Sequence, residues 1–200
     1  MKLLIQIIFF SLLPFHNLFA DEASAWLKKE IDTILNSYEN VNMSDETRFL
    51  MIEDTINYKF AGKALGKAVA KQAYNLASEE VRDEYIKLFK RHIALNLTSM
   101  MQGYSNQFYA IVDSRYNQKN KTYMIDMEIT NGASKIMVTW RVVKHKENFY
   151  IIDLYIANIS LMQTKRSEFN SALKTVDNDL KKFNQILKKQ NDLNYSKFID

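Results

Sequence analysis

The chain has 200 residues, 47% of them hydrophobic and 25% charged, with no cysteine and a formal net charge of +4. This length and apolar content suit one globular domain with a substantial core and argue against global disorder. The absence of cysteine excludes disulfides and thiol chemistry, and the charge is too small and too scattered to favour nucleic-acid binding.

Residues 1–20 have the pattern of a cleavable secretory signal. Lys2 gives a positive start, residues 3–13 are apolar apart from two polar side chains, and Ala20 precedes an acidic pair. We expect cleavage after Ala20, which leaves residues 21–200 as one exported domain. A membrane anchor is the alternative, but the apolar run is shorter than the roughly 20 residues that a spanning helix needs.

The N-terminal part of this domain has the periodicity of helices. Apolar residues at helical spacing predict an amphipathic helix over residues 21–37. A second helix is expected over 44–58, because Ser44 can cap it and two acidic residues follow in its first turn. Over residues 60–76, two glycines among many alanines indicate short, closely packed helices.

Ser78, followed by two glutamates, is the clearest helix start in the chain. We expect this long helix to run to about Met101 and to end at Gly103, so that the N-terminal helices occupy residues 21–104. The stripe at spacings of three and four, most of it large and apolar, consists of Val81, Tyr85, Leu88, Phe89, His92, Leu95, Asn96 and Ser99.

Residues 108–159 change to the pattern of strands. Runs rich in β-branched and aromatic residues lie at 108–116, 121–131, 135–145 and 148–159. Because the connections are short, neighbouring strands must be antiparallel. Alternation groups Ile136, Val138, Trp140 and Val142 in the third strand, and Tyr150, Ile152, Leu154 and Ile156 in the fourth. One face of the sheet is therefore expected to be buried.

After the sheet, helical patterns over 161–173 and 176–189 precede a polar tail that we expect to fray. The predicted C-terminal helices thus occupy about 160–190. Helices, then a meander of strands, then helices define an α+β fold, in which a curved antiparallel sheet of about four strands packs against several helices.

Residues suited to catalysis are few in the mature chain. His92 and His145 lack the spacing of metal ligands, and no nucleophile or phosphate-loop motif occurs. We interpret His92 as a core histidine and His145 as a solvated one. Asp126, Glu128 and Asp153 are strand carboxylates, which serve as general bases when they are pushed into an apolar cavity. Solvent-facing strand positions are the simpler interpretation, so we expect no catalytic residues.

Large apolar side chains are abundant, with 12 Phe, 11 Tyr and 9 Met. Such side chains fill a core or line a cavity, and methionine suits both. Composition does not separate these two cases, so a structural envelope protein with a filled core stays an open alternative.

Three segments of the chain, taken together in their order and spacing, form a recognisable sequence pattern. They are Ser78–Arg82 at the start of the long helix, the strand segments Trp140-Arg141 and Asn148–Asp153, and Ile159–Phe169, where the last strand turns into a helix. In this order and spacing they resemble the MlaC family of periplasmic phospholipid carriers, also called toluene-tolerance auxiliary proteins. The resemblance is looser over residues 60–76, and Glu79 stands where the family commonly has proline.

The resemblance implies an NTF2-like cone with an apolar cavity, and a periplasmic, monomeric shuttle that carries a glycerophospholipid between the outer and inner membranes. It implies an Mla-type transport system as partner, with an inner-membrane ABC transporter that has an MCE-domain subunit and an outer-membrane lipoprotein complex. No metal or cofactor is expected. The alternative from another class is an NTF2-like cavity enzyme that uses a buried carboxylate, Asp153 or Glu128, as general base.

The resemblance also suggests lipid-binding residues. The candidates for the apolar lining, each equally compatible with an ordinary core, are Tyr85, Phe89, Ile93, Leu97, Val138, Trp140, Val142, Ile152, Leu154 and Ile156. Thr164, Lys165 and Arg166 lie where the family's helix at the pocket mouth begins. Either Lys165 or Arg166 would meet a lipid phosphate there, or the two form a solvated surface pair.

Overall fold

The computed structural model describes residues 17–102, 104 and 107–199. The described elements are α1 (Asn17–Glu39), α2 (Asp45–Lys59), α3 (Gly62–Leu76), α4 (Glu79–Met101), β1 (Phe108–Asn117), β2 (Thr122–Asn131), β3 (Ser134–His145), β4 (Asn148–Ile156), β5 (Ile159–Ser160), α5 (Leu161–Lys174) and α6 (Leu180–Ile199). Most of the expected signal, and Gly103 as the end of the long helix, lie outside the described residues. The elements confirm the predicted α+β class.

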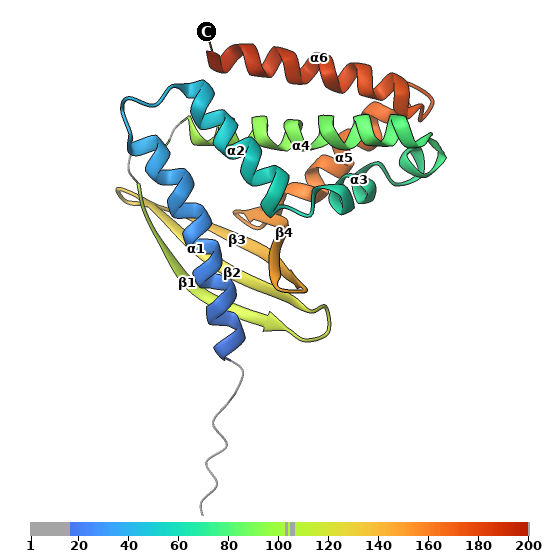
Figure 1. Ribbon diagram of the computed structural model, residues 1–200. Coiled ribbons are helices and arrows are strands. Elements are labelled where there is room, and N and C mark those ends of the chain that lie inside the picture. The colour runs from blue at the N-terminus through green and yellow to red at the C-terminus, as the bar shows by residue number, and fades with distance from the viewer. Residues whose placement is uncertain (1–16, 103, 105–106, 200) are drawn as a thin grey trace, which may run out of the picture.

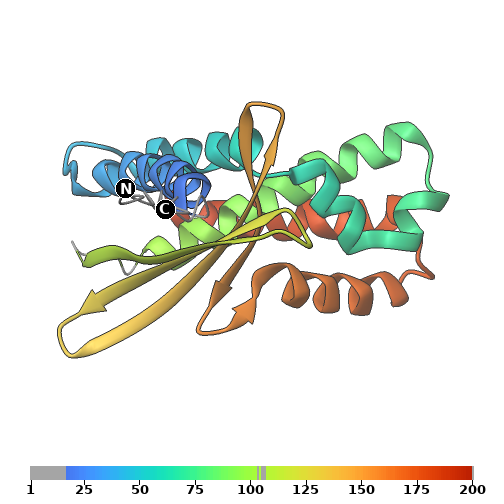
Figure 2. The same cartoon turned by 90° about the horizontal axis from the view of Figure 1, so that it is seen from below.

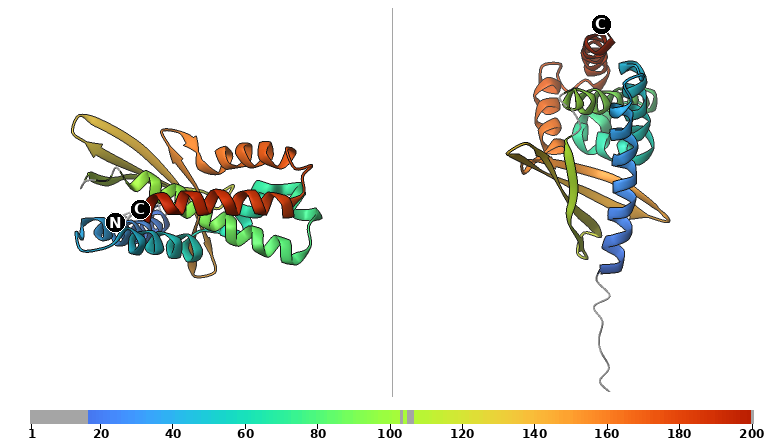
Figure 3. Two further views of the ribbon diagram at one scale, coloured as in Figure 1. Left: turned by 90° about the horizontal axis from the view of Figure 1, so that it is seen from above. Right: turned by 90° about the vertical axis from the view of Figure 1, so that its left-hand side faces the viewer.

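The five strands form one antiparallel sheet in the order β1-β2-β3-β4-β5, which is curved and strongly twisted (Figures 1 and 2). Helix α1 crosses one face of the sheet, and α2 to α6 gather at one end of it (Figure 1). Seen from above, α6 lies along α4 (Figure 3). The short strand β5 adds a fifth strand to the four that we predicted, because the chain turns at Ala157 and Asn158, both with positive φ.

Serine side chains cap the N-termini of α2 and α4. The Ser44 side chain accepts a hydrogen bond from the Thr47 amide (3.2 Å), and Ser78 accepts one from the Val81 amide (3.4 Å), as the sequence predicted. In α3, Lys71 has φ 41° and interrupts the helix, which confirms short helices in this region.

A β-bulge changes the face to which the residues of β4 point. Trp140 pairs with Leu154 and Arg141 with Asp153, but Val142 then pairs with Ile151, so that Ile152 is the additional residue. Alternation restarts at this point, and Ile151 is buried whereas Ile152 is only half-buried. Strict alternation had assigned Tyr150 and Ile152 to the buried face, which is wrong for both for this reason.

The C-terminal segment is a long helix rather than a fraying tail. Helix α6 runs from Leu180 to Ile199. The Asp179 carboxylate caps its start by accepting hydrogen bonds from the amides of Lys181 and Lys182. Its last turns are held by side chains. Asn191 is fully buried and donates to the Leu88 carbonyl (2.9 Å), and the Tyr195 ring lies 5.0 Å from that of Phe49. The sequence prediction of an end near residue 189 missed these contacts.

An aromatic cluster fills the space between α3, α4, α5 and α6. Tyr85 and Phe89 of α4 contact Phe169 of α5, and Phe183 of α6 lies 5.0 Å from Phe169 between ring centres. The Tyr85 hydroxyl donates to the Gly66 carbonyl (3.1 Å). These rings are buried, and close packing of this kind leaves little free volume in this half of the molecule.

His92 lies at the junction of α4, α5 and α6, where it is 2% exposed. The Asn191 amide nitrogen donates to a backbone carbonyl, so its oxygen accepts from Nδ1 of His92 (3.1 Å). The other ring nitrogen, Nε2, is buried and has no hydrogen-bond partner within the described part of the chain. Burial, with the positive charge of Lys165 as the next cause, lowers the pKa of His92 from 6.5 to about 4, although Asn191 and Glu168 oppose this shift.

We therefore expect acid to destabilise the protein through His92. A histidine whose pKa is lower in the folded chain stabilises the fold fully above pH 6.5, and this contribution disappears as the pH falls from 6.5 through 4. The loss should approach about 3 kcal/mol, at 1.36 kcal/mol per pKa unit. Urea unfolding between pH 7 and pH 4 measures it. His92→Gln should have a flatter pH dependence, and His145→Gln, in the exposed hairpin, should match the unsubstituted protein; equal slopes in all three would contradict the assignment.

Candidate functional site

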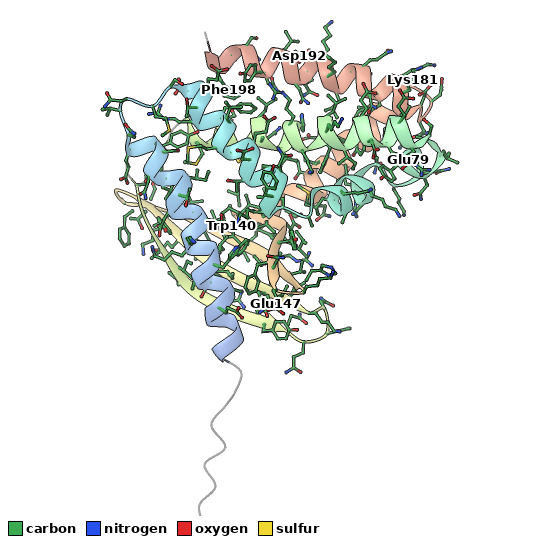
Figure 4. The ribbon with its side chains drawn as sticks, viewed as in Figure 1. Glu79, Trp140, Glu147, Lys181, Asp192 and Phe198 are labelled. Atoms are coloured by element: carbon green, nitrogen blue, oxygen red, sulfur yellow. The ribbon has the colours of Figure 1, made fainter. Side chains whose placement is uncertain are left out.

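A cavity of about 470 Å³ lies between the sheet and the helices α1, α2 and the end of α4. Its wall is formed by Leu27, Glu30, Ile31, Ile34, Leu35, Ile52, Thr55, Ile56, Phe60, Leu97, Met100, Met101, Tyr104, Gln107, Tyr109, Met127, Ile129, Ile136, Val138, Trp140, Ile151, Leu154 and Ile156. Figure 4 shows Trp140 where α1 passes over the sheet. Almost all of these side chains are apolar, so the cavity suits an apolar ligand.

The cavity is open at one end and closed at the other. Met100 and Ile136 line it and yet are 50% and 46% exposed, so they mark the open end, which we call the mouth. Along β3 the same face continues through Val138 and Trp140 to Val142, which is fully buried and lies outside the cavity. Near Val142 the Phe149 ring packs 5.5 Å from that of Trp26, and neither residue lines the cavity.

Three polar side chains in the wall are bonded to the protein itself, whereas the buried Nε1 of Trp140 has no hydrogen-bond partner among the described residues. Glu30 forms an ion pair with Lys59 of α2 at 2.8 Å, the Thr55 hydroxyl donates to the Met51 carbonyl at 2.9 Å, and the Tyr109 hydroxyl donates to the Asp32 carboxylate of α1. Besides Glu30, none of the described wall residues carries a full charge. The interior therefore offers little to a charged headgroup.

Half of the predicted apolar residues lie in this wall. Leu97, Val138, Trp140, Leu154 and Ile156 line the cavity. Tyr85, Phe89, Ile93 and Val142 are buried in the packed core instead, and the bulge in β4 takes Ile152 off the cavity face. The long helix contributes its C-terminal turns to the cavity, whereas its middle contacts the aromatic cluster.

Sequence reasoning missed the wall that α1 and α2 provide. Ile31, Ile34 and Leu35 of α1 follow helical spacing and were interpreted only as part of an amphipathic helix. Such a stripe is the same whether it faces a filled core or a cavity, so the sequence contained no signal that distinguished them.

Thr164, Lys165 and Arg166 lie on α5, and none of them lines the cavity. The Thr164 hydroxyl donates to the Ser160 carbonyl (2.9 Å). Lys165 is 7% exposed and pairs with Glu168 at 2.7 Å, so it is neither a solvated surface residue nor available at the mouth. Arg166 is exposed. We therefore expect any lipid headgroup to depend on other residues.

Asp153 organises the junction of β4, β5 and α5. Its carboxylate is 5% exposed and accepts hydrogen bonds from the Leu154 amide (2.8 Å), the Met162 amide (3.2 Å) and the Ser160 hydroxyl (2.7 Å). The Ser160 side chain in turn accepts from the Gln163 amide (3.0 Å) and caps α5. Ile159–Phe169, one of the three segments that carried the family resemblance, thus forms a folded junction rather than a wall of the cavity.

The other strand carboxylates also lie outside the cavity wall. Asp126 pairs with Arg115 at 2.8 Å and accepts from the Thr139 hydroxyl at 2.7 Å, and Glu128 pairs with Lys135 at 2.8 Å. The general-base hypothesis named Asp153 or Glu128 inside a cavity, and neither carboxylate is placed there.

Within the described part of the chain, no helix combines the length and the apolar character that a membrane span requires. The same residues contain no cluster of three His, Asp or Glu side chains that would hold a metal ion.

The fold and the cavity define an α+β protein in which a curved antiparallel sheet and helices surround an apolar space. The profile of the MlaC protein family matches residues 28–190, and the chain belongs to this family. Among solved structures, the phospholipid-binding protein from Ralstonia solanacearum, in complex with a phospholipid, has the same fold. Its TM-score is 0.74 at 14% sequence identity, with 88% of this chain and 98% of that chain covered. No curated protein gives a significant match.

Proposed function

We propose that the protein is a periplasmic carrier that holds a phospholipid by its acyl region and moves it between the outer and inner membranes. The observation that carries this proposal is the apolar cavity that opens at Met100 and Ile136. Membership of the MlaC family and the phospholipid in the structural neighbour support it.

Burial of acyl chains provides the affinity. Each methylene removed from water contributes about 0.8 kcal/mol, so a chain of fifteen methylenes contributes roughly 12 kcal/mol. Escape into water is therefore slow. A bilayer offers a similarly apolar environment, so exchange between membrane and carrier is nearly balanced, and the carrier acts by keeping the lipid out of water during transfer.

The cellular setting follows from the same proposal. Residues 1–20 act as a signal for export, and residues 21–200 form one lipid-binding domain. Loading and unloading require partners that provide a continuous apolar path. For an Mla-type system these are an inner-membrane ABC transporter with an MCE-domain subunit and an outer-membrane lipoprotein complex.

Native mass spectrometry of protein purified without detergent tests the carrier function. We expect a phospholipid bound to each molecule in repeated preparations. The unloaded protein should extract lipid from vesicles of phosphatidylethanolamine and phosphatidylglycerol. Protein that neither retains nor takes up any lipid would contradict the proposal.

A further inference from the structure

Helix α6 holds the excess of positive charge, which was interpreted from the sequence as scattered. The described residues of α6 include five lysines and one acidic residue, Asp192, so the helix has the same net charge as the +4 of the whole chain. These lysines are Lys181, Lys182, Lys188, Lys189 and Lys197. The rest of the chain is neutral by the same count, so α6 makes one side of the molecule basic.

Most of these lysines form rows on the side of α6 that faces solvent. Residues seven positions apart lie on nearly the same face of a helix, about 10.5 Å from each other along its axis. Helix α6 is on the outside of the molecule, with α4 beneath it (Figures 1 and 3). Three exposed pairs, which together we call the basic face, follow this spacing: Lys181 with Lys188, Lys182 with Lys189, and Ile186 with Leu193.

Interactions within the protein do not account for these lysines. Lys181 and Lys182 lie in the first turn of α6, where the positive end of the helix dipole disfavours cations. Lys188 pairs with Asp192 at 2.7 Å on the surface, but among the described residues no ion pair joins Lys181, Lys182 or Lys189 to an acidic side chain. An anionic surface outside the protein would therefore stabilise this arrangement.

The composition of the basic face favours a lipid surface over a protein partner. Interfaces between proteins are enriched in arginine and aromatic residues and depleted in lysine. The exposed residues of α6 that the structure describes include no arginine and no aromatic ring. A lysine is a flexible point charge, which suits the diffuse phosphates of a membrane. The exposed side chains of Ile186 and Leu193 can enter the boundary between headgroups and acyl chains.

We infer that α6 docks the protein on membranes that contain anionic phospholipid. Helix α6 contributes no residue to the cavity wall, and α4 lies between α6 and the sheet (Figure 1). Docking through the basic face therefore does not require the mouth at Met100 and Ile136 to face the membrane. The contact goes beyond the proposed carrier function, because it concentrates the protein at a membrane whether or not the cavity holds a lipid.

Co-sedimentation of the mature chain with vesicles tests the inference. One set of vesicles consists of phosphatidylcholine, and the other is an equimolar mixture with phosphatidylglycerol. Each lysine near an anionic surface contributes roughly fivefold in affinity, so the three lysines without an acidic partner predict about a hundredfold tighter binding to the mixed vesicles. Added salt should weaken this binding, since it screens charges at an exposed surface.

A pair of variants with equal charge identifies the surface. The first changes four lysines of the basic face to glutamine, and we expect it to bind the mixed vesicles about a hundredfold more weakly: Lys181, Lys182, Lys188 and Lys189. The control changes four exposed lysines elsewhere to glutamine and should bind nearly as well as the unsubstituted protein: Lys29, Lys63, Lys67 and Lys119. None of the eight lines the cavity, so both variants should retain bound phospholipid in native mass spectrometry.

Three results would overturn the docking inference and leave the carrier function standing. Equal losses in the two variants would show that only net charge matters. Equal binding to both kinds of vesicle would show that anionic lipid is not recognised. Binding to neither kind would favour an acidic protein as the partner of α6. Conversely, docking on mixed vesicles by a protein that never holds a lipid would contradict the carrier function alone.

Discussion

Replacing Asp153 with alanine is expected to lower the free energy of unfolding by about 3 kcal/mol or more. The substitution leaves two backbone amides, of Leu154 and Met162, and the Ser160 hydroxyl without their common acceptor in a buried position. A buried donor that loses its partner costs about 1–3 kcal/mol. The same carboxylate ties β4 to the first turn of α5, so its loss should also loosen this junction.

Urea unfolding at neutral pH measures the effect, and Asp126→Ala is the matched control. Asp126 is also a strand carboxylate, but its ion pair with Arg115 is partly solvated, so its removal should cost only about 1 kcal/mol. Asp153→Asn should fall between the two, because its side-chain oxygen can still accept from the backbone. A folded Asp153→Ala protein of unchanged stability would show that the junction does not depend on this carboxylate.

Local signals in the sequence predicted the helix starts well. Ser44 and Ser78 cap their helices as expected, because a serine followed by acidic residues has a local physical effect that needs no tertiary contact. The end of the last helix was predicted ten residues too early, judged from 189 to Ile199. Its order comes from Asn191 and Tyr195 contacting α4 and α2, and such contacts between distant residues leave no local pattern.

The sheet shows a second limit. Period-two alternation was correct along β3, where Val138 and Trp140 face the cavity, and it failed in β4 at one additional residue, Ile152. A bulge inverts all positions on one side of it, yet it has no reliable mark in the sequence. The family resemblance identified the fold correctly, but one of its segments, Ile159–Phe169, is a structural junction at Asp153 and not the site itself.

Filling the cavity should abolish lipid binding while the protein stays folded. We expect Val138→Trp to bring an indole into the space between the mouth and Trp140, where the acyl chain would lie. Because the cavity receives the added volume, the free energy of unfolding should change by less than about 1.5 kcal/mol. Native mass spectrometry after incubation with lysophospholipid or phospholipid vesicles should find no bound lipid.

Val142→Trp is the matched control, since it is the same substitution on the same face of the same strand. Val142 is fully buried beyond the closed end of the cavity, so the indole has no space there. Overpacking should cost at least about 3 kcal/mol, at the upper end of its usual range. If both variants unfold alike, the space around Val138 behaves as a filled core. If Val138→Trp folds and still binds lipid, the acyl chain lies elsewhere. The pair thus separates a cavity from a core by experiment, the distinction that the abundance of Phe, Tyr and Met left open.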